Sequence, residues 1–182
     1  KPLGAYGDGG AVFTDDDEIA SVMRSIRVHG QGGHRYDNVR VGINGRLDTL
    51  QAAVLLAKMA IFPEEVRLRD EAASRYARLL GGGPVTTPAV PEGFTSVWAQ
   101  YSVLAESEAA RATLMERLKA EGIPTAIYYP LPLHLQGAFK ALGYRAGDFP
   151  ASESAAGRIF SLPMHPYLAP EDQERIAKVL KG

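Results

Sequence analysis

Phenols, an imidazole and a carboxamide are concentrated in one short segment, residues 128–136. The segment runs Tyr-Tyr-Pro-Leu-Pro-Leu-His-Leu-Gln and contains Tyr128, Tyr129, His134 and Gln136. Such side chains can stack on a base or sugar ring and can hydrogen-bond to hydroxyl groups. A packed proline-rich connection around a buried aromatic residue explains the same composition equally well. The segment is therefore a candidate ligand loop, and it names no reaction by itself.

A second polar segment runs from Gly30 to Arg46 and holds five glycines and three arginines. A loop of this length without evident structure is uncommon unless it serves a function. His29 precedes it, at the expected end of a helix. There an imidazole is as consistent with a structural cap as with a ligand role.

Several common catalytic patterns are absent. The glycine-rich stretch Gly4–Gly10 precedes an expected strand and lacks the Gly-Lys-Ser/Thr ending, which argues against a phosphate-binding P-loop. The four histidines do not pair at helical spacing, so no metal site is expected. No Gly-x-Ser-x-Gly elbow occurs. Paired carboxylates fall only at expected helix starts, where they complement the helix dipole.

Composition sets wider bounds. The chain has 182 residues, with 20 Lys and Arg against 21 Asp and Glu, and a formal net charge of −1. This balance argues against a general nucleic-acid binder. The hydrophobic fraction of 46% and charged fraction of 23% are typical of a soluble globular protein. There is no cysteine for disulfides or thiolate metal sites, and no apolar run of about 18 residues predicts a membrane span.

Strands and helices alternate in the pattern, which predicts an α/β fold. A short buried strand is expected at residues 10–13, followed by a helix with Thr14 as its N-cap. A long helix is expected from Leu47 to Leu80, interrupted at Pro63. Beyond a Gly/Pro-rich boundary, we expect strands at 97–105, 123–129 and 159–162, helices at 108–121, 151–158 and 170–180, and at most a short helix near residue 138 within the 130–150 loop.

Six segments, in this order and spacing, carry a recognisable set of motifs: residues 1–10 (Lys-Pro-Leu-Gly-Ala-Tyr-Gly-Asp-Gly-Gly), 28–30, 41–48, 51–53, 129–136 and 161–166. The set resembles the DegT/DnrJ/EryC1/StrS family of pyridoxal-phosphate-dependent nucleotide-sugar aminotransferases. The resemblance implies the α/β architecture of a fold-type I pyridoxal-phosphate transferase, similar to aspartate aminotransferase. It also implies that residues 1–80 form the end of the large domain and residues 84–182 the small C-terminal domain.

The resemblance gives Lys1 a specific role. In the family, the lysine heading this stretch forms the Schiff base with pyridoxal 5'-phosphate and transfers protons during the reaction. The cofactor's pyridine ring supplies the electron sink. An amine works in this way only in a desolvated or cationic setting, which a free terminal residue lacks. We therefore expect the native chain to extend upstream of Lys1.

Asn44 corresponds to the family asparagine that reaches the phosphate of the neighbouring subunit's cofactor, which implies a homodimer with shared active sites. Its amide and the nearby guanidinium of Arg46 are suitable donors to a phosphate dianion, and Arg46 is also a candidate substrate contact. Two alternatives stay open: Asn44 as a left-handed turn residue between glycines, and Arg46 as the exposed start of the long helix.

Tyr129, His134 and Gln136 match the loop that approaches the nucleotide-sugar in relatives. Relatives often have His-Tyr-Pro where this chain has Tyr128-Tyr129-Pro130. Tyr128 can stack and donate a hydrogen bond, but it cannot carry the charge of an imidazolium. The nucleotide contact and the particular substrate therefore stay open.

The resemblance thus implies an aminotransferase that moves an amino group from L-glutamate to a nucleotide-linked keto-sugar. The expected setting is the cytoplasmic synthesis of lipopolysaccharide, other cell-surface polysaccharides or antibiotic sugars, with no nucleic-acid or membrane partner. One alternative is a sugar dehydratase of the same fold, against which Lys1 argues because such relatives carry histidine there. The other is a catalytically inert fragment that serves as an interaction module.

Overall fold

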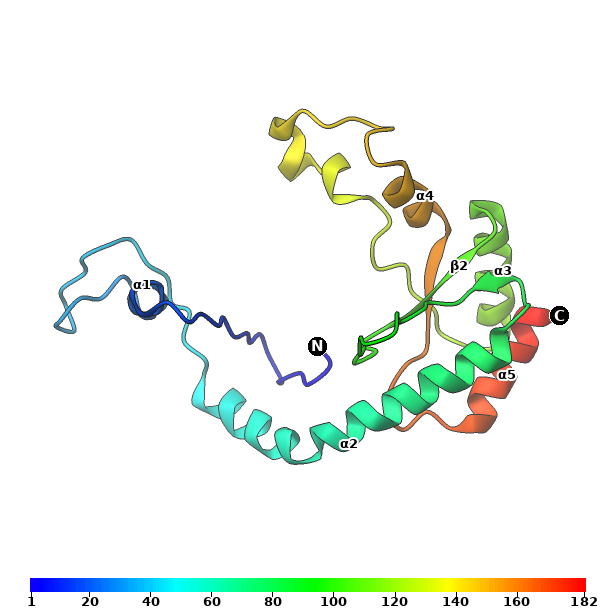
Figure 1. Cartoon of the computed structure of the whole chain (residues 1–182), viewed down its shortest axis with the longest axis horizontal. Helices are drawn as coiled ribbons and strands as arrows, with labels where there is room; N and C mark the ends of the chain where they lie inside the picture. The colour runs from blue at the N-terminus through cyan, green and yellow to red at the C-terminus, as the bar shows by residue number, and fades with distance from the viewer. The chain divides into compact units, whose positions relative to one another are not determined.

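A computed structural model describes residues 1–182. The chain divides into two units, one of Lys1 with Leu3–Phe62 and one of Pro2 with Pro63–Gly182. The elements labelled in Figure 1 and their neighbours are, in chain order, α1 (Asp17–Arg27), α2 (Thr49–Leu80), β1 (Val85–Thr86), β2 (Tyr101–Ala105), α3 (Glu108–Ala120), the 3-10 helices η1 (Leu133–Leu135) and η2 (Gly137–Leu142), α4 (Pro150–Arg158), β3 (Ile159–Leu162) and α5 (Pro170–Lys181). None of these helices has the length and apolar character needed to cross a membrane.

The second unit is built on a three-stranded antiparallel sheet in the order β1–β2–β3 (Figure 1). Alternate residues of β2, namely Tyr101, Val103 and Ala105, are buried, while the residues between them are partly exposed. Successive side chains of a strand point to opposite faces, so this alternation directs one face of the sheet into the core.

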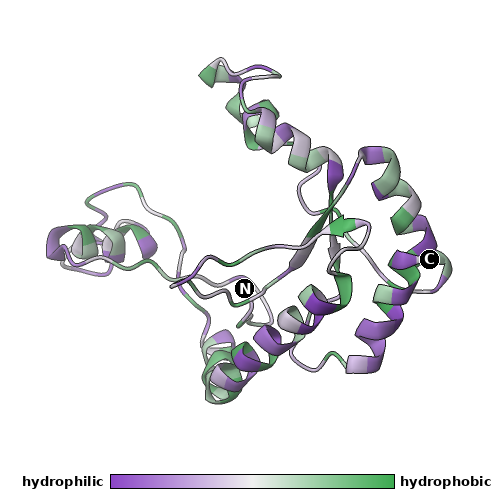
Figure 2. Ribbon diagram, turned by 45° about the vertical axis from the view of Figure 1, so that its right-hand side comes forward, coloured by the Kyte–Doolittle hydropathy of each residue, from purple (hydrophilic) through white to green (hydrophobic).

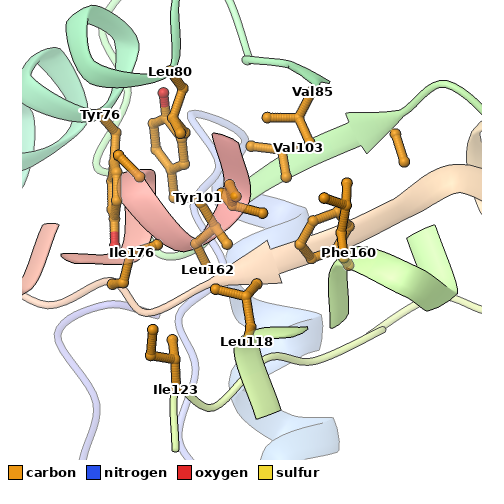
Figure 3. Close-up of a cluster of buried hydrophobic side chains, with 14 of the residues drawn as sticks. Tyr76, Leu80, Val85, Tyr101, Val103, Leu118, Ile123, Phe160, Leu162 and Ile176 are labelled. Atoms are coloured by element: carbon orange, nitrogen blue, oxygen red, sulfur yellow. The ribbon is translucent and has the colours of Figure 1, made fainter. Parts of the chain in front are cut away.

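Three helices contribute to that core. Tyr76 of α2 packs against Tyr101 with ring centroids 4.9 Å apart (Figure 3). The Tyr76 hydroxyl donates to the carbonyl of Pro163 at 3.1 Å. Burial raises the pKa of Tyr101 to about 12, so its phenol stays neutral. The other large side chains of this core are aromatic Phe160 and aliphatic Leu80, Leu114, Leu118, Leu162, Ile176 and Leu180.

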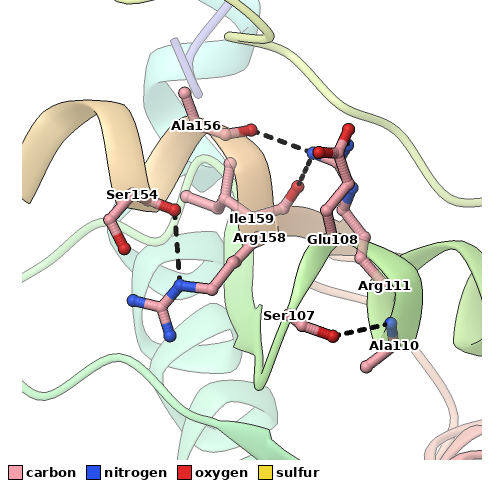
Figure 4. Close-up of polar contacts among 8 residues, drawn as sticks. All are labelled: Ser107, Glu108, Ala110, Arg111, Ser154, Ala156, Arg158 and Ile159. Atoms are coloured by element: carbon pink, nitrogen blue, oxygen red, sulfur yellow. Dashed lines mark hydrogen bonds and ion pairs between the residues drawn. The ribbon is translucent and has the colours of Figure 1, made fainter.

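Helix α4 passes into β3 without a connecting loop, since Arg158 ends the helix and Ile159 begins the strand. Arg111 of α3, whose side chain is 12% exposed, reaches this junction. Its Nη1 donates to the carbonyl of Ala156 at 2.9 Å and approaches that of Ile159 at 3.5 Å (Figure 4). One guanidinium therefore donates to the Ala156 carbonyl near the end of α4, where helix carbonyls lack a partner, and to the Ile159 carbonyl at the start of β3.

The first unit is not built around buried hydrophobic side chains. None of the buried hydrophobic side chains of the chain lies in residues 1–62. Hydrophobic and hydrophilic residues alternate along α1, as Figure 2 shows, yet its apolar residues Ile19 and Ile26 are 51% and 37% exposed. Within the described chain, backbone and side-chain hydrogen bonds hold this unit's segments to one another.

The predicted N-cap of α1 is wrong by two residues. The carboxylate of Asp16 accepts from the backbone N–H of Ile19 at 2.9 Å, and the Thr14 hydroxyl accepts instead from Asp16 at 3.1 Å. A carboxylate at the cap both satisfies a free N–H and complements the helix dipole.

The predicted break at Pro63 is also wrong, because α2 continues through it. Proline removes one helix hydrogen bond, but Pro63 is exposed, so water can satisfy the carbonyl that loses its partner. Just beyond it, Arg67 forms ion pairs with Glu64 (2.6 Å) and Glu71, at the spacings that support a helix.

Two predicted strands are shorter than expected and one is absent. β2 starts at Tyr101 because Trp98 adopts a left-handed conformation with φ 47°. The 123–129 strand is reduced to a single bridge between Ala126 and Ser161. Residues 10–13 form no strand, since no neighbouring segment supplies a ladder. The predicted β3 and the helices corresponding to α3, α4 and α5 are confirmed to within one residue at each end.

The Arg111 contact gives a first prediction. Arg111→Met keeps the aliphatic stem but leaves the α4 carbonyls without a donor, so the free energy of unfolding should fall by about 1–3 kcal/mol. The matched control is Arg67→Met on an exposed ion pair, which should cost about 0.5 kcal/mol or less. Urea denaturation of both variants measures the difference, and equal effects would contradict a role for Arg111 at the junction.

Candidate functional site

The candidate residues fall in both units. Lys1, Asn44 and Arg46 belong to the first, whereas the segment from Tyr128 to Gln136 belongs to the second. Within each unit, the structure shows what holds these residues in place.

The segment that carries Asn44 is tied to the C-terminal end of α1. Backbone N–H groups of Ile43 and Gly45 donate to the carbonyls of Ile26 and Arg27, both at 2.8 Å. Asn44 itself forms an antiparallel bridge with Val28. The path of this segment is therefore determined by the helix end, which otherwise would leave carbonyls unpaired.

Two glycines make that path possible. A Cβ on Gly42 would collide with the backbone of Gly30 and lie 2.7 Å from the carbonyl oxygen of Ile26. Gly30 has φ 76°, and a Cβ there would collide with the carbonyl of Arg40. Only glycine permits both the positive φ and this backbone approach.

Asn44 and Arg46 are brought together. Arg46 Nε donates to Asn44 Oδ1 at 3.0 Å, and both side chains are exposed. This bond uses the amide's acceptor and leaves its NH₂ group and the terminal guanidinium nitrogens as donors. Such a donor set fits an anion such as a phosphate or carboxylate. Asn44 has neither αL geometry nor a positive φ, so the turn interpretation does not hold.

Lys1 is exposed and heads a segment that lies along the first half of α2. Gln51 Oε1 accepts from the backbone N–H of Tyr6 at 2.7 Å, and Lys58 Nζ donates to the carbonyl of Gly4 at 2.6 Å. A Cβ on Gly7 would lie 3.2 Å from the Gln51 amide. Two side chains of one helix therefore hold the stretch that follows Lys1.

Tyr128 and Tyr129 are neighbours with ring centroids 6.5 Å apart, and they are 52% and 64% exposed. Tyr128 also lines a small cavity of about 190 Å³ whose walls include Gln100, Ser161 and Met164. Both phenols are thus accessible to a ligand.

His134 and Gln136 use their polar atoms within the chain. Gln136 Nε2 donates to the carbonyl of Leu131 at 3.2 Å. His134 Nε2 lies 3.0 Å from Glu153 Oε1, and its ring packs against Phe149 at 4.7 Å between centroids. The imidazole side chain is only 8% exposed.

Glu153 accepts several hydrogen bonds at once. The backbone N–H of Gly147 donates to it at 2.9 Å and that of Phe149 at 3.3 Å, besides the contact with His134. The Gly147 bond, followed by those of Phe149 and His134, holds the pKa of the Glu153 carboxyl below its usual range. Glu153 is therefore ionised and acts only as an acceptor at neutral pH.

Three of these residues, Gln51, Lys58 and Glu153, have roles that the local sequence pattern does not assign. The partners of Gln51 and Lys58 are 45 and 54 residues away. The sequence offers one indication for Glu153: it is an acidic residue in the first turn of a helix that begins with Pro150. No group of three or more His, Asp or Glu side chains is arranged to hold a metal ion.

The sequence and the fold both match one family. The sequence model of the DegT/DnrJ/EryC1/StrS aminotransferase family covers residues 1–181, and the chain belongs to this family. A curated relative, the UDP-2-acetamido-2-deoxy-3-oxo-D-glucuronate aminotransferase of Pseudomonas aeruginosa, is 48% identical over 168 residues, which are 92% of this chain and 45% of the relative.

Solved structures agree. The crystal structure of a DegT/DnrJ/EryC1/StrS aminotransferase from Brucella abortus is 53% identical with a TM-score of 0.92, covering 100% of this chain and 48% of that one. DesV of S. venezuelae, solved in complex with a ketimine intermediate, is 35% identical with a TM-score of 0.91 and the same coverage. The chain thus spans about half the length of these relatives. The expected fold class, a mixed α/β fold-type I pyridoxal-phosphate transferase fold, is confirmed.

The glycine contact yields a second prediction. Gly42→Ala should displace the segment holding Asn44 and destabilise its pairing with α1 by about 1–3 kcal/mol. Amide hydrogen exchange at Ile43 and Gly45 should then quicken roughly 5- to 150-fold. Gly33→Ala is the control, since a Cβ there meets nothing within 4 Å. Unchanged exchange in Gly42→Ala would show that the backbone approach is not required.

Proposed function

We propose that this chain carries part of the active site of a pyridoxal-phosphate-dependent aminotransferase, which moves an amino group from L-glutamate to a nucleotide-linked keto-sugar. The carrying observation is the exposed Asn44–Arg46 donor pair on a backbone fixed by α1, in a chain that matches the family over residues 1–181. In this proposal, residues 1–80 are the end of the large domain and residues 84–182 are the small domain.

Lys1 supplies the reactive amine. Pyridoxal phosphate, when bound, provides an electron sink and stores the amino group between the two halves of the reaction. Lys1 Nζ would hold the cofactor covalently, and the same amine, when free, would take and return a proton at the reacting carbon. Gln51 and Lys58 support this role because they hold the segment that follows Lys1 against α2.

Asn44 and Arg46 bind anionic groups in a homodimer with shared active sites. The Asn44 amide would donate to the cofactor phosphate of the neighbouring subunit, and Arg46 would provide a cationic contact for phosphate or substrate.

Tyr128 and Tyr129 contact the nucleotide-sugar by stacking and by hydrogen bonds from their exposed hydroxyls. His134 and Gln136 belong to the same loop and complete it. A cytoplasmic location and a place in the synthesis of lipopolysaccharide, other surface polysaccharides or antibiotic sugars are part of the proposal. They rest on the family resemblance alone.

Covalent trapping tests the role of Lys1. The complete native polypeptide is incubated with pyridoxal phosphate and reduced with borohydride, and its peptides are then analysed by mass spectrometry. The cofactor mass is expected on Lys1, and Lys1→Ala should abolish both this label and amination of UDP-2-acetamido-2-deoxy-3-oxo-D-glucuronate. Lys119→Ala, on the exposed face of α3, is the control and should retain both. Loss of water from the sugar without amine incorporation would favour the dehydratase instead.

Mixing two inactive variants tests the shared site. Lys1→Ala and Asn44→Ala are each expected to lose nearly all activity as homodimers. If each site takes its lysine from one subunit and its asparagine from the other, mixed dimers hold one intact site. Refolding the two together should then restore about a quarter of wild-type activity. No recovery in demonstrably mixed dimers would place both residues in the same subunit's site.

A further inference from the structure

The two exposed tyrosines lie on a strap, residues 127–133, that is fastened at both ends to one continuous piece of the fold. At the first end, Ala126 and Ser161 exchange backbone hydrogen bonds at 2.8 and 3.3 Å. At the second end, His134 Nε2 meets Glu153 Oε1 at 3.0 Å. Ser161 lies in β3 and Glu153 in α4, which join without a loop. Both anchors of the strap therefore move as one body.

Glu153 is equipped to fix the second anchor. It is the only acceptor that the His134 ring meets within the chain, and it also receives the N–H groups of Gly147 and Phe149. Because the carboxylate can only accept, the proton must sit on Nε2 of His134. Phe149 then packs on the imidazole at 4.7 Å, which restricts rotation of the ring.

The polar side chains of the loop fall into two groups, those bonded within the chain and those exposed. His134 is nearly buried on Glu153, and Gln136 closes the turn onto Leu131 at 3.2 Å. Tyr128 and Tyr129 lie between the anchors with exposed rings. The geometry therefore separates groups that hold the loop from groups that can touch a ligand.

We propose that Glu153 is a positioning residue for the nucleotide-sugar, which acts through His134 to hold the strap that presents Tyr128 and Tyr129. The inference rests on the proposed function, because it concerns the sugar half of that reaction. In this proposal His134 does not bind the sugar directly. Its Nε2 is bonded to Glu153, and the bond fixes the path of the strap.

Single substitutions at Glu153 test this. Glu153→Ala should raise the KM for UDP-2-acetamido-2-deoxy-3-oxo-D-glucuronate roughly tenfold, as expected for loss of a charge-assisted hydrogen bond. The half-reaction with glutamate, followed by absorbance, should change less than about twofold because no step of it uses the strap. Glu153→Gln keeps one acceptor oxygen, so its KM for the sugar nucleotide should lie between those of the wild type and Glu153→Ala. Glu116→Ala, at an exposed glutamate of α3 that is in no ion pair, should match wild type.

Two histidine variants separate positioning from direct contact. A glutamine amide nitrogen can occupy the place of Nε2, whereas the asparagine amide is shorter and corresponds to Nδ1. Positioning through Glu153 predicts that His134→Gln retains more activity than His134→Asn, and that Glu153→Ala adds nothing to His134→Asn. The opposite order, with His134→Asn the more active, would overturn the proposal in favour of a direct Nδ1 contact.

Hydrogen exchange gives a readout independent of catalysis. The amides of Leu135 and Gln136 donate to Pro132 and Leu133, next to the second anchor. Their exchange should quicken in Glu153→Ala and not in Glu116→Ala. Unchanged exchange, or a parallel loss of both half-reactions with a lowered Tm, would overturn the proposal. Failure of the wild type to react with glutamate or sugar would instead reject the proposed function, while the exchange result would still decide the anchoring.

Discussion

The direct junction between α4 and β3 is the constraint on which the second unit depends. With no loop between them, Ile159–Leu162 must pair with β2 in a register that buries Phe160 and Leu162, and α4 must leave the sheet in a fixed direction. Arg111 binds carbonyls on either side of the junction, so α3 is fastened to the same place. This junction therefore fixes the positions of the core, of the packed helices and of the loop that carries the candidate ligand residues.

The backbone path of the first unit is fixed in a different way. It has no buried hydrophobic side chain, yet the path from Val28 to Gly45 is closely determined by backbone hydrogen bonds to the end of α1. Gly30 and Gly42 allow the two backbones to approach without side chains between them. The position of this segment is set by hydrogen bonds to the unpaired carbonyls at the end of α1. Hydrogen bonds are directional, whereas hydrophobic contacts are not.

Much of the second unit could be predicted locally. The helices of α3 and α5 follow from caps and charged ends, and β3 from a short apolar run. Local pattern failed where the outcome depended on distant segments. Residues 10–13 are strand-like in composition but have no partner, and Pro63 is tolerated because it is exposed. Trp98, left-handed and bonded to Arg69 and Asp70 on α2, delays the start of β2. The candidate residues were recognised from motif order, but not the bond between His134 and Glu153, because no spacing rule joins positions 19 apart.

The double anchoring of residues 127–133 has an evolutionary consequence. A loop whose two ends are fixed on one rigid piece can change its internal sequence without altering the core or the helices around it. The first anchor is a backbone bridge and tolerates many side chains. Besides Ile127, which packs against the core, only His134 and Glu153 then need to be kept together. Under the proposed function, sugar preference would then diverge among descendants by exchange of residues such as Tyr128, while the surrounding fold stays unchanged.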